Sequence, residues 1–328
     1  MTRDLRRTPP LVLGCLVLGI LPINLGIPHV NSHADEPQSN ETQSNEVQSD
    51  ATKTGVEPVG EIEVVADGFA FTEGPADDGR GGFYFTDIPN NTIHHVDAND
   101  QLTAFTKTSR HANGLLVHEQ TLYACEMDGQ LVAHDIASKT RTVLADQYEG
   151  KRFNACNDLD RDESGGIYFT DPLYRAPTPL PQKVQAVYYR DPGGAVTRLT
   201  GDIKAPNGIG LSPDGKRLYI APTGQAAMIV HDVVSPGKLS EGRTFCTLKQ
   251  PPGRSGTGSD GIAIDVRGNV YFTTNLGIQI YSPEGSMIGL VEFPQQPANV
   301  TFAGKDKKSL IVTARSAVYR VRMPIAGK

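Results

Sequence analysis

Residues 206–221, Pro206-Asn-Gly-Ile-Gly-Leu-Ser-Pro-Asp-Gly-Lys-Arg-Leu-Tyr-Ile-Ala221, indicate the fold class. Ile209 and Leu211 alternate with small residues, as in a half-buried strand, and residues 218–221 form a second apolar run. The sequence between them, residues 212–215, is typical of a turn, because proline fixes φ and Asp and Gly favour turn positions. The segment therefore predicts a β-hairpin with Asn207 at the start of its first strand.

The same order of features occurs six times along the chain. In each unit an Asn, Asp or Glu precedes an apolar strand residue by ten to twelve positions. The strand residues are Tyr84, Tyr123, Tyr168, Tyr219, Tyr271 and Ile311, and they lie 39 to 52 residues apart. The polar residues are Glu73, Asn113, Asn157, Asn207, Asp260 and Asn299. A strand-based repeat of this length is typical of propeller blades, so we predict an all-β protein, a six-bladed β-propeller.

Residues 1–34 have the pattern of a secretory signal peptide. A basic start precedes an apolar run over residues 11–27, and Ser32 and Ala34 supply small residues before a cleavage site. A membrane anchor is the alternative, but prolines interrupt the run before it reaches the roughly 20 apolar residues that a span needs. We expect cleavage after Ala34, a secreted or periplasmic location, and no membrane association after cleavage.

The remainder divides into a linker and one domain. Residues 35–58 are polar and repetitive, so we expect a flexible linker. Residues 59–324 have the length of one six-bladed propeller. Without residues 1–34, which carry three Arg and one Asp, the formal charge changes from −6 to −8. The acidic balance and scattered basic residues argue against nucleic acid as a partner, and we expect a monomer.

The six polar residues define the candidate site. Equivalent positions of successive blades are related by rotation, so we expect these residues to form one ring around the channel. Its Glu73 and Asp260 give the ring two carboxylates, and all six side chains offer oxygen, which favours one hard divalent cation. Calcium is expected ahead of magnesium or manganese, and zinc comes last because the ring has neither His nor Cys.

Each ring residue taken alone also has a structural explanation. Asn-Gly and Asp-Gly pairs are common turn sequences, so Asn207 or Asp260 by itself would predict only a turn. Glu73 is different, because Glu is a poor turn residue and yet stands at the same repeat position.

Several of these segments together resemble one known family. In order and spacing they match the senescence marker protein (regucalcin), gluconolactonase and luciferin-regenerating-enzyme family over about residues 60–322. The matching segments are Phe71-Thr-Glu-Gly-Pro75, Asn157-Asp158, Ile167-Tyr-Phe-Thr-Asp-Pro172, Pro206-Asn-Gly208 and Asp260-Gly-Ile262. The resemblance implies a six-bladed propeller that holds one divalent ion, often calcium, and hydrolyses lactones, while some relatives cleave organophosphates.

The resemblance also implies roles for individual residues. Glu73, Asn207 and Asp260 match the metal ligands of the family, and Asn157 matches an asparagine that completes the metal shell or contacts substrate. By the repeat register alone, Asn113 is a further substrate-binding candidate. His111 stands two residues before Asn113, where it lines the pocket mouth or is an ordinary loop histidine.

The expected reaction is the hydrolytic ring opening of a small-molecule lactone, a sugar lactone or a related one. A metal ion polarises the carbonyl, and a carboxylate assists the attacking water. By resemblance to the family, Asp260 is the candidate for this carboxylate, and Asp158 is the reserve. Ala155 and Cys156 depart from the family pattern before Asn157, so a preference for sugar lactones does not transfer to this chain.

Two alternatives remain open at the level of sequence. The first is a non-catalytic propeller that binds a partner and holds a structural ion in its channel. The second is an organophosphate-type esterase. Metal-dependent ester turnover separates the enzymes from the binding module.

Overall fold

The computed structural model describes residues 55–253 and 256–328. These residues form strands β1 to β27 and contain no helix that is long and apolar enough to cross a membrane. The signal peptide expected over residues 1–34 and most of the expected linker lie outside the described residues.

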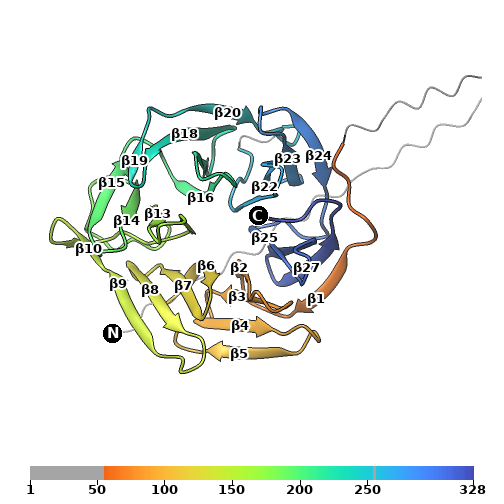
Figure 1. Cartoon of the computed structure of the whole chain (residues 1–328), viewed down its shortest axis with the longest axis horizontal. Coiled ribbons are helices and arrows are strands. Elements are labelled where there is room, and N and C mark those ends of the chain that lie inside the picture. Colours follow the sequence, from red (N-terminus) through yellow and green to blue (C-terminus); the bar gives the residue numbers. More distant parts are fainter. Residues whose placement is uncertain (1–54, 254–255) are drawn as a thin grey trace, which may run out of the picture. The chain divides into compact units, whose positions relative to one another are not determined.

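Six antiparallel sheets succeed one another around a central axis, which confirms the predicted six-bladed propeller (Figure 1). The first contains β2 (Thr72–Asp77), β3 (Phe83–Asp87), β4 (Thr92–Val96) and β5 (Leu102–Thr106). The second contains β6 (Ala112–His118), β7 (Thr121–Glu126), β8 (Gln130–Asp135) and β9 (Arg141–Ala145). The third contains β12 (Leu159–Arg161), β13 (Ile167–Asp171), β14 (Ala186–Arg190) and β15 (Val196–Thr200).

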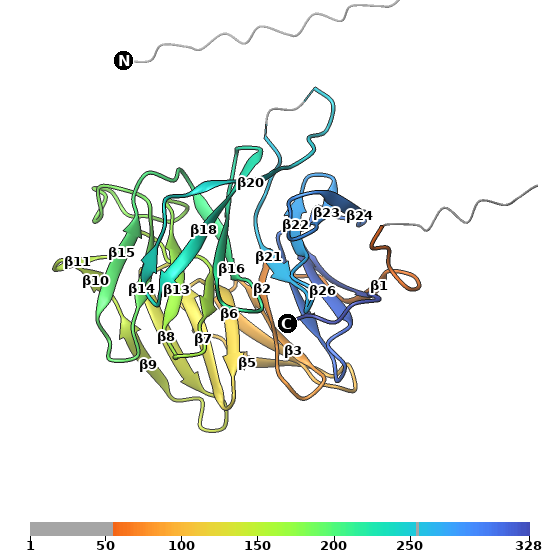
Figure 2. The same ribbon diagram turned by 45° about the horizontal axis from the view of Figure 1, so that its top comes forward.

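The next two sheets repeat this order. The fourth contains β16 (Pro206–Leu211), β17 (Arg217–Pro222), β18 (Ala227–Ser235) and β20 (Arg243–Thr247), with the short β19 (Lys238–Leu239) beside β18. The fifth contains β21 (Ile262–Ile264), β22 (Val270–Thr274), β23 (Gly277–Tyr281) and β24 (Met287–Val291). A small ribbon of β10 (Gln147–Tyr148) and β11 (Lys151–Arg152) lies at the rim near β15 (Figure 2).

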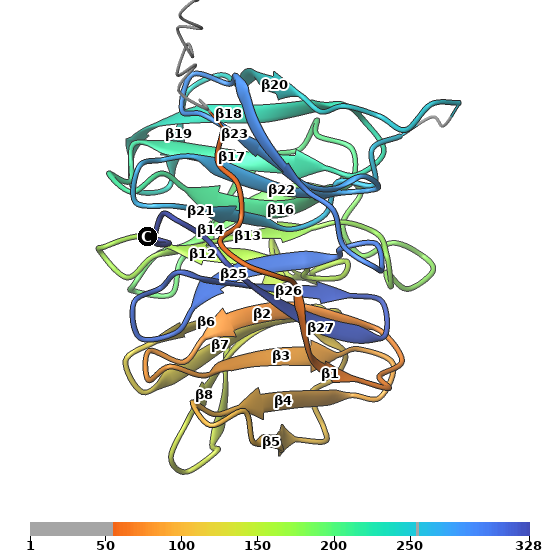
Figure 3. The ribbon, with the colours of Figure 1, turned by 90° about the vertical axis from the view of Figure 1, so that its right-hand side faces the viewer.

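The sixth sheet joins the two ends of the domain. It contains β25 (Asn299–Ala303), β26 (Ser309–Ala314) and β27 (Ala317–Arg322), and its outer strand is β1 (Glu63–Asp67) from the start of the domain (Figure 3). Arg320 of β27 pairs with Glu63 at 2.9 Å and with Asp100 of the first blade at 2.8 Å. Such partly exposed ion pairs contribute about 0–1 kcal/mol each. Most of the free energy that closes the propeller therefore comes from the backbone hydrogen bonds between β1 and β27 and from the packed core.

The predicted hairpin of residues 206–221 is confirmed and shows how each blade is built. Leu211 of β16 pairs with Leu218 of β17, and the Gly215 N–H donates to the Ser212 carbonyl at 2.8 Å across the turn. Gly215 has a φ of 67°, a left-handed conformation that glycine adopts without a steric penalty.

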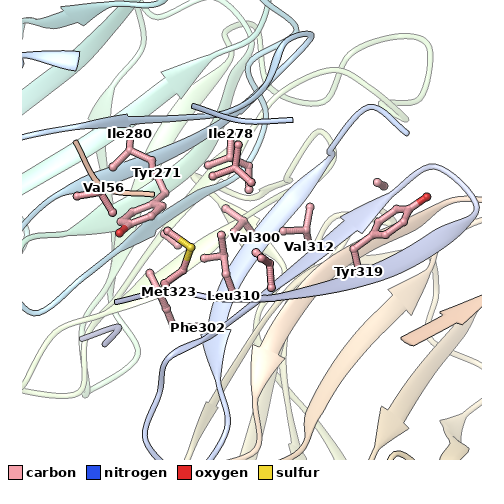
Figure 4. Close-up of a cluster of buried hydrophobic side chains, with 14 of the residues drawn as sticks. Val56, Tyr271, Ile278, Ile280, Val300, Phe302, Leu310, Val312, Tyr319 and Met323 are labelled. Carbon is pink, nitrogen blue, oxygen red and sulfur yellow. The ribbon is translucent and has the colours of Figure 1, made fainter. Parts of the chain in front are cut away.

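Apolar side chains fill the space between neighbouring sheets. Between the fifth and sixth blades, Tyr271 and Ile280 pack with Leu310 and Val312 in one buried cluster (Figure 4). This packing extends a few residues beyond the expected domain of 59–324, because both Val56 and Ile325 belong to the same cluster. The interlocked sheets give the rigid frame on which the channel residues stand.

The first strand of each sheet faces the axis. Strand β2 contacts both β6 and β25, β16 contacts β21, and β12 contacts β6 and β16, so these strands surround the channel. Each inner strand begins within two residues of one of the six predicted ring residues. The fold therefore brings one end of every inner strand to the same end of the channel.

Candidate functional site

All six predicted ring residues lie within two residues of the start of an inner strand. Glu73, Asn113, Asn207 and Asn299 stand at the first or second position of β2, β6, β16 and β25, whereas Asn157 and Asp260 stand two residues before β12 and β21. Five of these side chains are buried, and Asp260 keeps partial exposure. The repeat register thus predicted a real structural equivalence.

Glycines after the ring residues allow the inner strands to approach one another. In four blades a glycine follows directly, in the pairs Glu73-Gly74, Asn113-Gly114, Asn207-Gly208 and Asp260-Gly261. The Gly208 N–H donates to the Asp260 carbonyl at 2.9 Å, and a Cβ on Gly208 would collide with that same oxygen. The Asn-Gly and Asp-Gly pairs at these positions therefore serve close strand contact, not the hairpin turns that such pairs often form.

Repeated threonines fix the ring backbone from the neighbouring blade. The Thr86 hydroxyl donates to the Asn113 carbonyl at 3.1 Å, and the Thr170 hydroxyl donates to the Asn207 carbonyl at 2.8 Å. In the fifth blade, Thr273 bonds the Ala298 carbonyl, which directly precedes Asn299. The sequence carried this signal as the repeated Tyr-Phe-Thr of three strands, but sequence analysis assigned the threonine no role.

In the first and third blades an aspartate directly follows this threonine and accepts hydrogen bonds from the segment that precedes the ring residue. Asp171 accepts the backbone N–H groups of Asn154 and Ala155 at 2.9 and 2.7 Å, and Asp87 accepts those of Ala70 and Phe71 in the first blade. Both aspartates thereby anchor a segment that ends two residues before a ring residue.

Three carboxylates gather at the ring, one more than the register predicted. Asp158 takes the position that glycine occupies in four other blades, and it is buried. Burial raises the pKa of Glu73 to about 7, and burial together with the Glu73 charge raises the pKa of Asp158 to about 8. Burial and then the charges of Glu73 and Asp158 hold the pKa of Asp260 well above its ordinary range.

Amide side chains complete this cluster. The Asn299 amide adjoins Glu73 and Asp158 and lowers the pKa of both, and Asn207 does the same for Asp260. Asn157 has no side-chain hydrogen bond to any residue that the structure describes, so its carboxamide is free for a ligand. Asn113 differs, because its amide nitrogen points toward the Met127 sulfur at 3.9 Å.

The donor set fits a hard divalent cation. Three mutually repelling carboxylates share a desolvated site, and the Arg315 guanidinium partly offsets the charges of Glu73 and Asp260. No group of three or more His, Cys, Asp or Glu in the described residues forms a metal cluster by itself, so a cation here needs amide oxygens as well. Mixed carboxylate and amide oxygens suit calcium or magnesium, not zinc.

Arg315 is a site residue that sequence analysis missed. It lies in the two-residue connection between β26 and β27, stacks over Phe71 at 5.5 Å and bonds the Gln296 side chain. Its φ of 52° is a left-handed conformation, which is uncommon for a bulky residue and recurs at functional sites. No carboxylate in the described part of the chain lies within ion-pair distance of its guanidinium.

His111 lies near the ring entrance, and its imidazole contacts Asp128, Arg175 and Asn91. Its Nδ1 is 3.1 Å from Asp128 Oδ1, and its Nε2 is 3.2 Å from Arg175 Nη2. Because arginine can only donate, Nε2 accepts and Nδ1 carries the proton toward Asp128. His111 therefore belongs to a polar network and is not an isolated loop histidine.

The ring stands at one end of a cavity of about 490 Å³ that follows the channel. Asp158 and Asn299 line the cavity near the ring, and Lys328 lines it farther along, where its ammonium group bonds Asp160 and the Leu211 carbonyl at 2.7 Å. Figure 1 shows the C-terminus near the axis, consistent with this position.

Comparisons with known proteins agree with this geometry. A sequence model of the SMP-30/Gluconolactonase/LRE-like region matches residues 71–316, a range that includes all six inner strands. The gluconolactonase of Zymomonas mobilis is 28% identical over 292 residues, which cover 81% of this chain and 82% of that protein.

Two solved structures share the fold. A gluconolactonase from Xanthomonas campestris has a TM-score of 0.74 and 23% identity, with 80% of this chain and 89% of that chain covered. A calcium-binding regucalcin from Agrobacterium tumefaciens has a TM-score of 0.70 and 21% identity, with 84% and 95% covered. At these identities the structural likeness shows the six-bladed architecture alone.

Proposed function

The chain belongs to the SMP-30/Gluconolactonase/LRE-like family, and on that premise we propose that it is a metal-dependent hydrolase that opens the ring of a small-molecule lactone. The observation that carries the proposal is the cluster of Glu73, Asp158 and Asp260 with amide side chains at one end of the channel. A propeller without a channel ion would gain no stability from three buried, mutually repelling carboxylates, whereas a divalent cation needs such ligands. Relatives named gluconolactonase and lactonohydrolase support the reaction class.

Glu73, Asn157, Asn207 and Asp260 would hold the cation, with calcium the expected ion. When bound, the ion supplies Lewis-acid chemistry that stabilises negative charge on a carbonyl oxygen. The regucalcin neighbour is described as calcium-binding, which supports this choice. Asn299 adjoins both Glu73 and Asp158, where its amide favours the ionised form of each carboxyl group.

Asp260 is the proposed group that orients water and takes its proton. It is the ring carboxylate that keeps some exposure, so water reaches it. Asp158 is buried on the cavity side, and one of its oxygens already accepts the Leu159 N–H at 3.0 Å, so it is the weaker candidate. His111 and Asn113 are proposed to contact substrate at the entrance, together with Asn157.

We further propose that the protein acts outside the cytoplasm as a monomer. The signal-peptide pattern of residues 1–34 supports export. A divalent site of the calcium type also suits an exported protein, because extracellular modules bind calcium with millimolar to submillimolar affinity.

Hydrolysis assays test the proposal directly. Purified protein is given glucono-δ-lactone, a simple aliphatic lactone and an aryl phosphotriester, each with calcium and with EDTA. The expected result is calcium-dependent opening of at least one lactone, abolished by EDTA and restored by added calcium. Absence of metal-dependent turnover of every ester would overturn the enzyme assignment and favour a binding propeller, and turnover of the phosphotriester alone would favour the esterase.

A further inference from the structure

One connection at the ring end of the propeller is much longer than its counterparts. The second and third strands of the other five blades are joined by two to four residues, whereas β13 and β14 are joined by residues 172–185. The far part of this loop is anchored, since Gln182 donates to the carbonyls of Tyr148 and Lys151 at 3.0 and 2.9 Å. The near part carries Tyr174 and Arg175 to the ring entrance.

Tyr174 of this loop joins a chain of hydroxyl groups. The Tyr174 hydroxyl donates to Thr223 Oγ1 at 2.8 Å, and the Thr223 hydroxyl donates to the Ser259 carbonyl at 2.9 Å. Each hydroxyl has one hydrogen, so both oxygens are left as acceptors. The chain ends one residue before Asp260.

Asn207 uses both of these acceptors. Its Nδ2 lies 2.9 Å from Thr223 Oγ1 and 3.2 Å from the Tyr174 hydroxyl. The reversed carboxamide would place Oδ1 against two oxygens whose hydrogens are already donated elsewhere, which leaves lone pairs facing one another. The network therefore fixes Nδ2 toward Thr223 and Tyr174, and no hydrogen bond from a residue that the structure describes engages Oδ1.

We propose that Thr223 and Tyr174 are positioning residues that orient the Asn207 carboxamide, so that its oxygen is presented to a divalent cation in the ring. The inference rests on the proposed cation site and adds the specific residues that prepare it. Neutral amide ligands need such support, because a carboxamide rotated by a half turn presents an N–H to the cation, not an oxygen. Partners behind metal ligands change affinity by about 10–100-fold in other proteins.

The loop of residues 172–185 also connects two blades at the ring entrance. Arg175 follows Tyr174 and bonds His111, which precedes Asn113 by two residues. The same short segment thus contacts a proposed cation ligand in the fourth blade and a proposed substrate-binding residue in the second. Two consecutive loop residues therefore contact His111 and Asn207, which belong to different blades.

Calcium titration calorimetry of the full chain tests the proposal without any substrate. Thr223→Val removes the Thr223 hydroxyl with little change of side-chain volume. Tyr174→Phe removes the phenolic hydroxyl and keeps the ring of a residue that is 44% exposed. We expect the calcium Kd to rise about 10–100-fold in Thr223→Val and to rise at least threefold in Tyr174→Phe. Thr223→Ser restores the hydroxyl and should return the Kd to near the wild-type value.

Controls separate positioning from general destabilisation. Thr103→Val removes a hydroxyl that bonds the His95 carbonyl in the outer part of the first blade, and its Kd should equal that of the wild type. If Thr223→Val fails to fold, the calcium Kd of Tyr174→Phe, which lies on the exposed loop, still tests the proposal. Unchanged Kd values in both site variants would overturn this inference alone, whereas no calcium binding by the wild type would overturn the cation site as well.

Discussion

Glu73→Gln should stabilise the cation-free protein while it removes its response to calcium. The Glu73 carboxylate is 2% exposed, and burial raises its pKa from 4.5 to about 7. One pKa unit corresponds to about 1.4 kcal/mol, so the ionised group costs the folded state on the order of 3 kcal/mol at pH 8. Glutamine keeps the shape of the side chain and removes that cost.

The sign follows from proton linkage. The folded state holds the Glu73 proton more tightly than the unfolded state, so the contribution of this group to stability is full below about pH 4.5 and is lost as pH rises through about 7. In chelator, wild type and variant should therefore differ least near pH 4.5. At pH 8 the variant should be the more stable by up to about 3 kcal/mol.

Urea unfolding at pH 8 measures the stability of the cation-free protein in EGTA and the gain in stability when calcium is added. A saturating cation stabilises the wild type by about 2.7 kcal/mol when its concentration is 100 times the Kd, and the variant should lose most of this gain. Glu292→Gln, at an exposed position, is the matched control and should leave both values unchanged. A Glu73→Gln protein that is less stable than the wild type in EGTA, or that keeps the full calcium gain, would contradict the role of Glu73 as a buried cation ligand.

Three further substitutions test other parts of the account. Asp260→Asn should lower kcat for lactone opening by about 100-fold or more, and undiminished turnover would remove Asp260 from the role of base. Thr170→Val leaves the buried Asn207 carbonyl without its 2.8 Å hydroxyl partner, so urea unfolding should show a loss of about 1–3 kcal/mol, with a smaller loss for Thr170→Ser. Asp171→Ala removes the acceptors of the Asn154 and Ala155 N–H groups, so urea unfolding at pH 5 should show a loss of about 1–3 kcal/mol. Burial raises the folded-state pKa of Asp171 to about 7, so the wild type loses stability as pH rises through 7, whereas the variant does not. The difference in unfolding free energy between wild type and variant should therefore be smaller at pH 8 than at pH 5. A larger difference at pH 8 would contradict this.

The sequence predicted the repeating parts of the structure. Each blade repeats one hairpin pattern, so the strands, the six blades and the position of Glu73 and Asn207 at the ring all followed from register. The repeat register left the glycines after the ring residues without an assigned role, because a turn and a close strand contact both favour Asn-Gly. Only the fold shows that a Cβ at Gly208 would strike the Asp260 carbonyl.

Features outside the repeat were not predictable in the same way. Asp158 interrupts a position that is glycine in four other blades, so its approach to Glu73 depends on the closure of the whole propeller. Arg315 and Tyr174 lie in connections of very different length, and no periodicity places a loop residue over the channel. Their roles arise from contacts between blades that are distant in sequence, such as the bond between Tyr174 and Thr223.

The most direct test of the central claim is the rate of lactone opening by the purified full chain as calcium is removed and returned. We predict hydrolysis above the spontaneous rate in calcium, loss of that activity in EDTA, and full recovery when calcium is restored. Hydrolysis that persists unchanged in EDTA, or no hydrolysis of any lactone in saturating calcium, would contradict a cation-dependent lactone hydrolase built on Glu73 and Asp260.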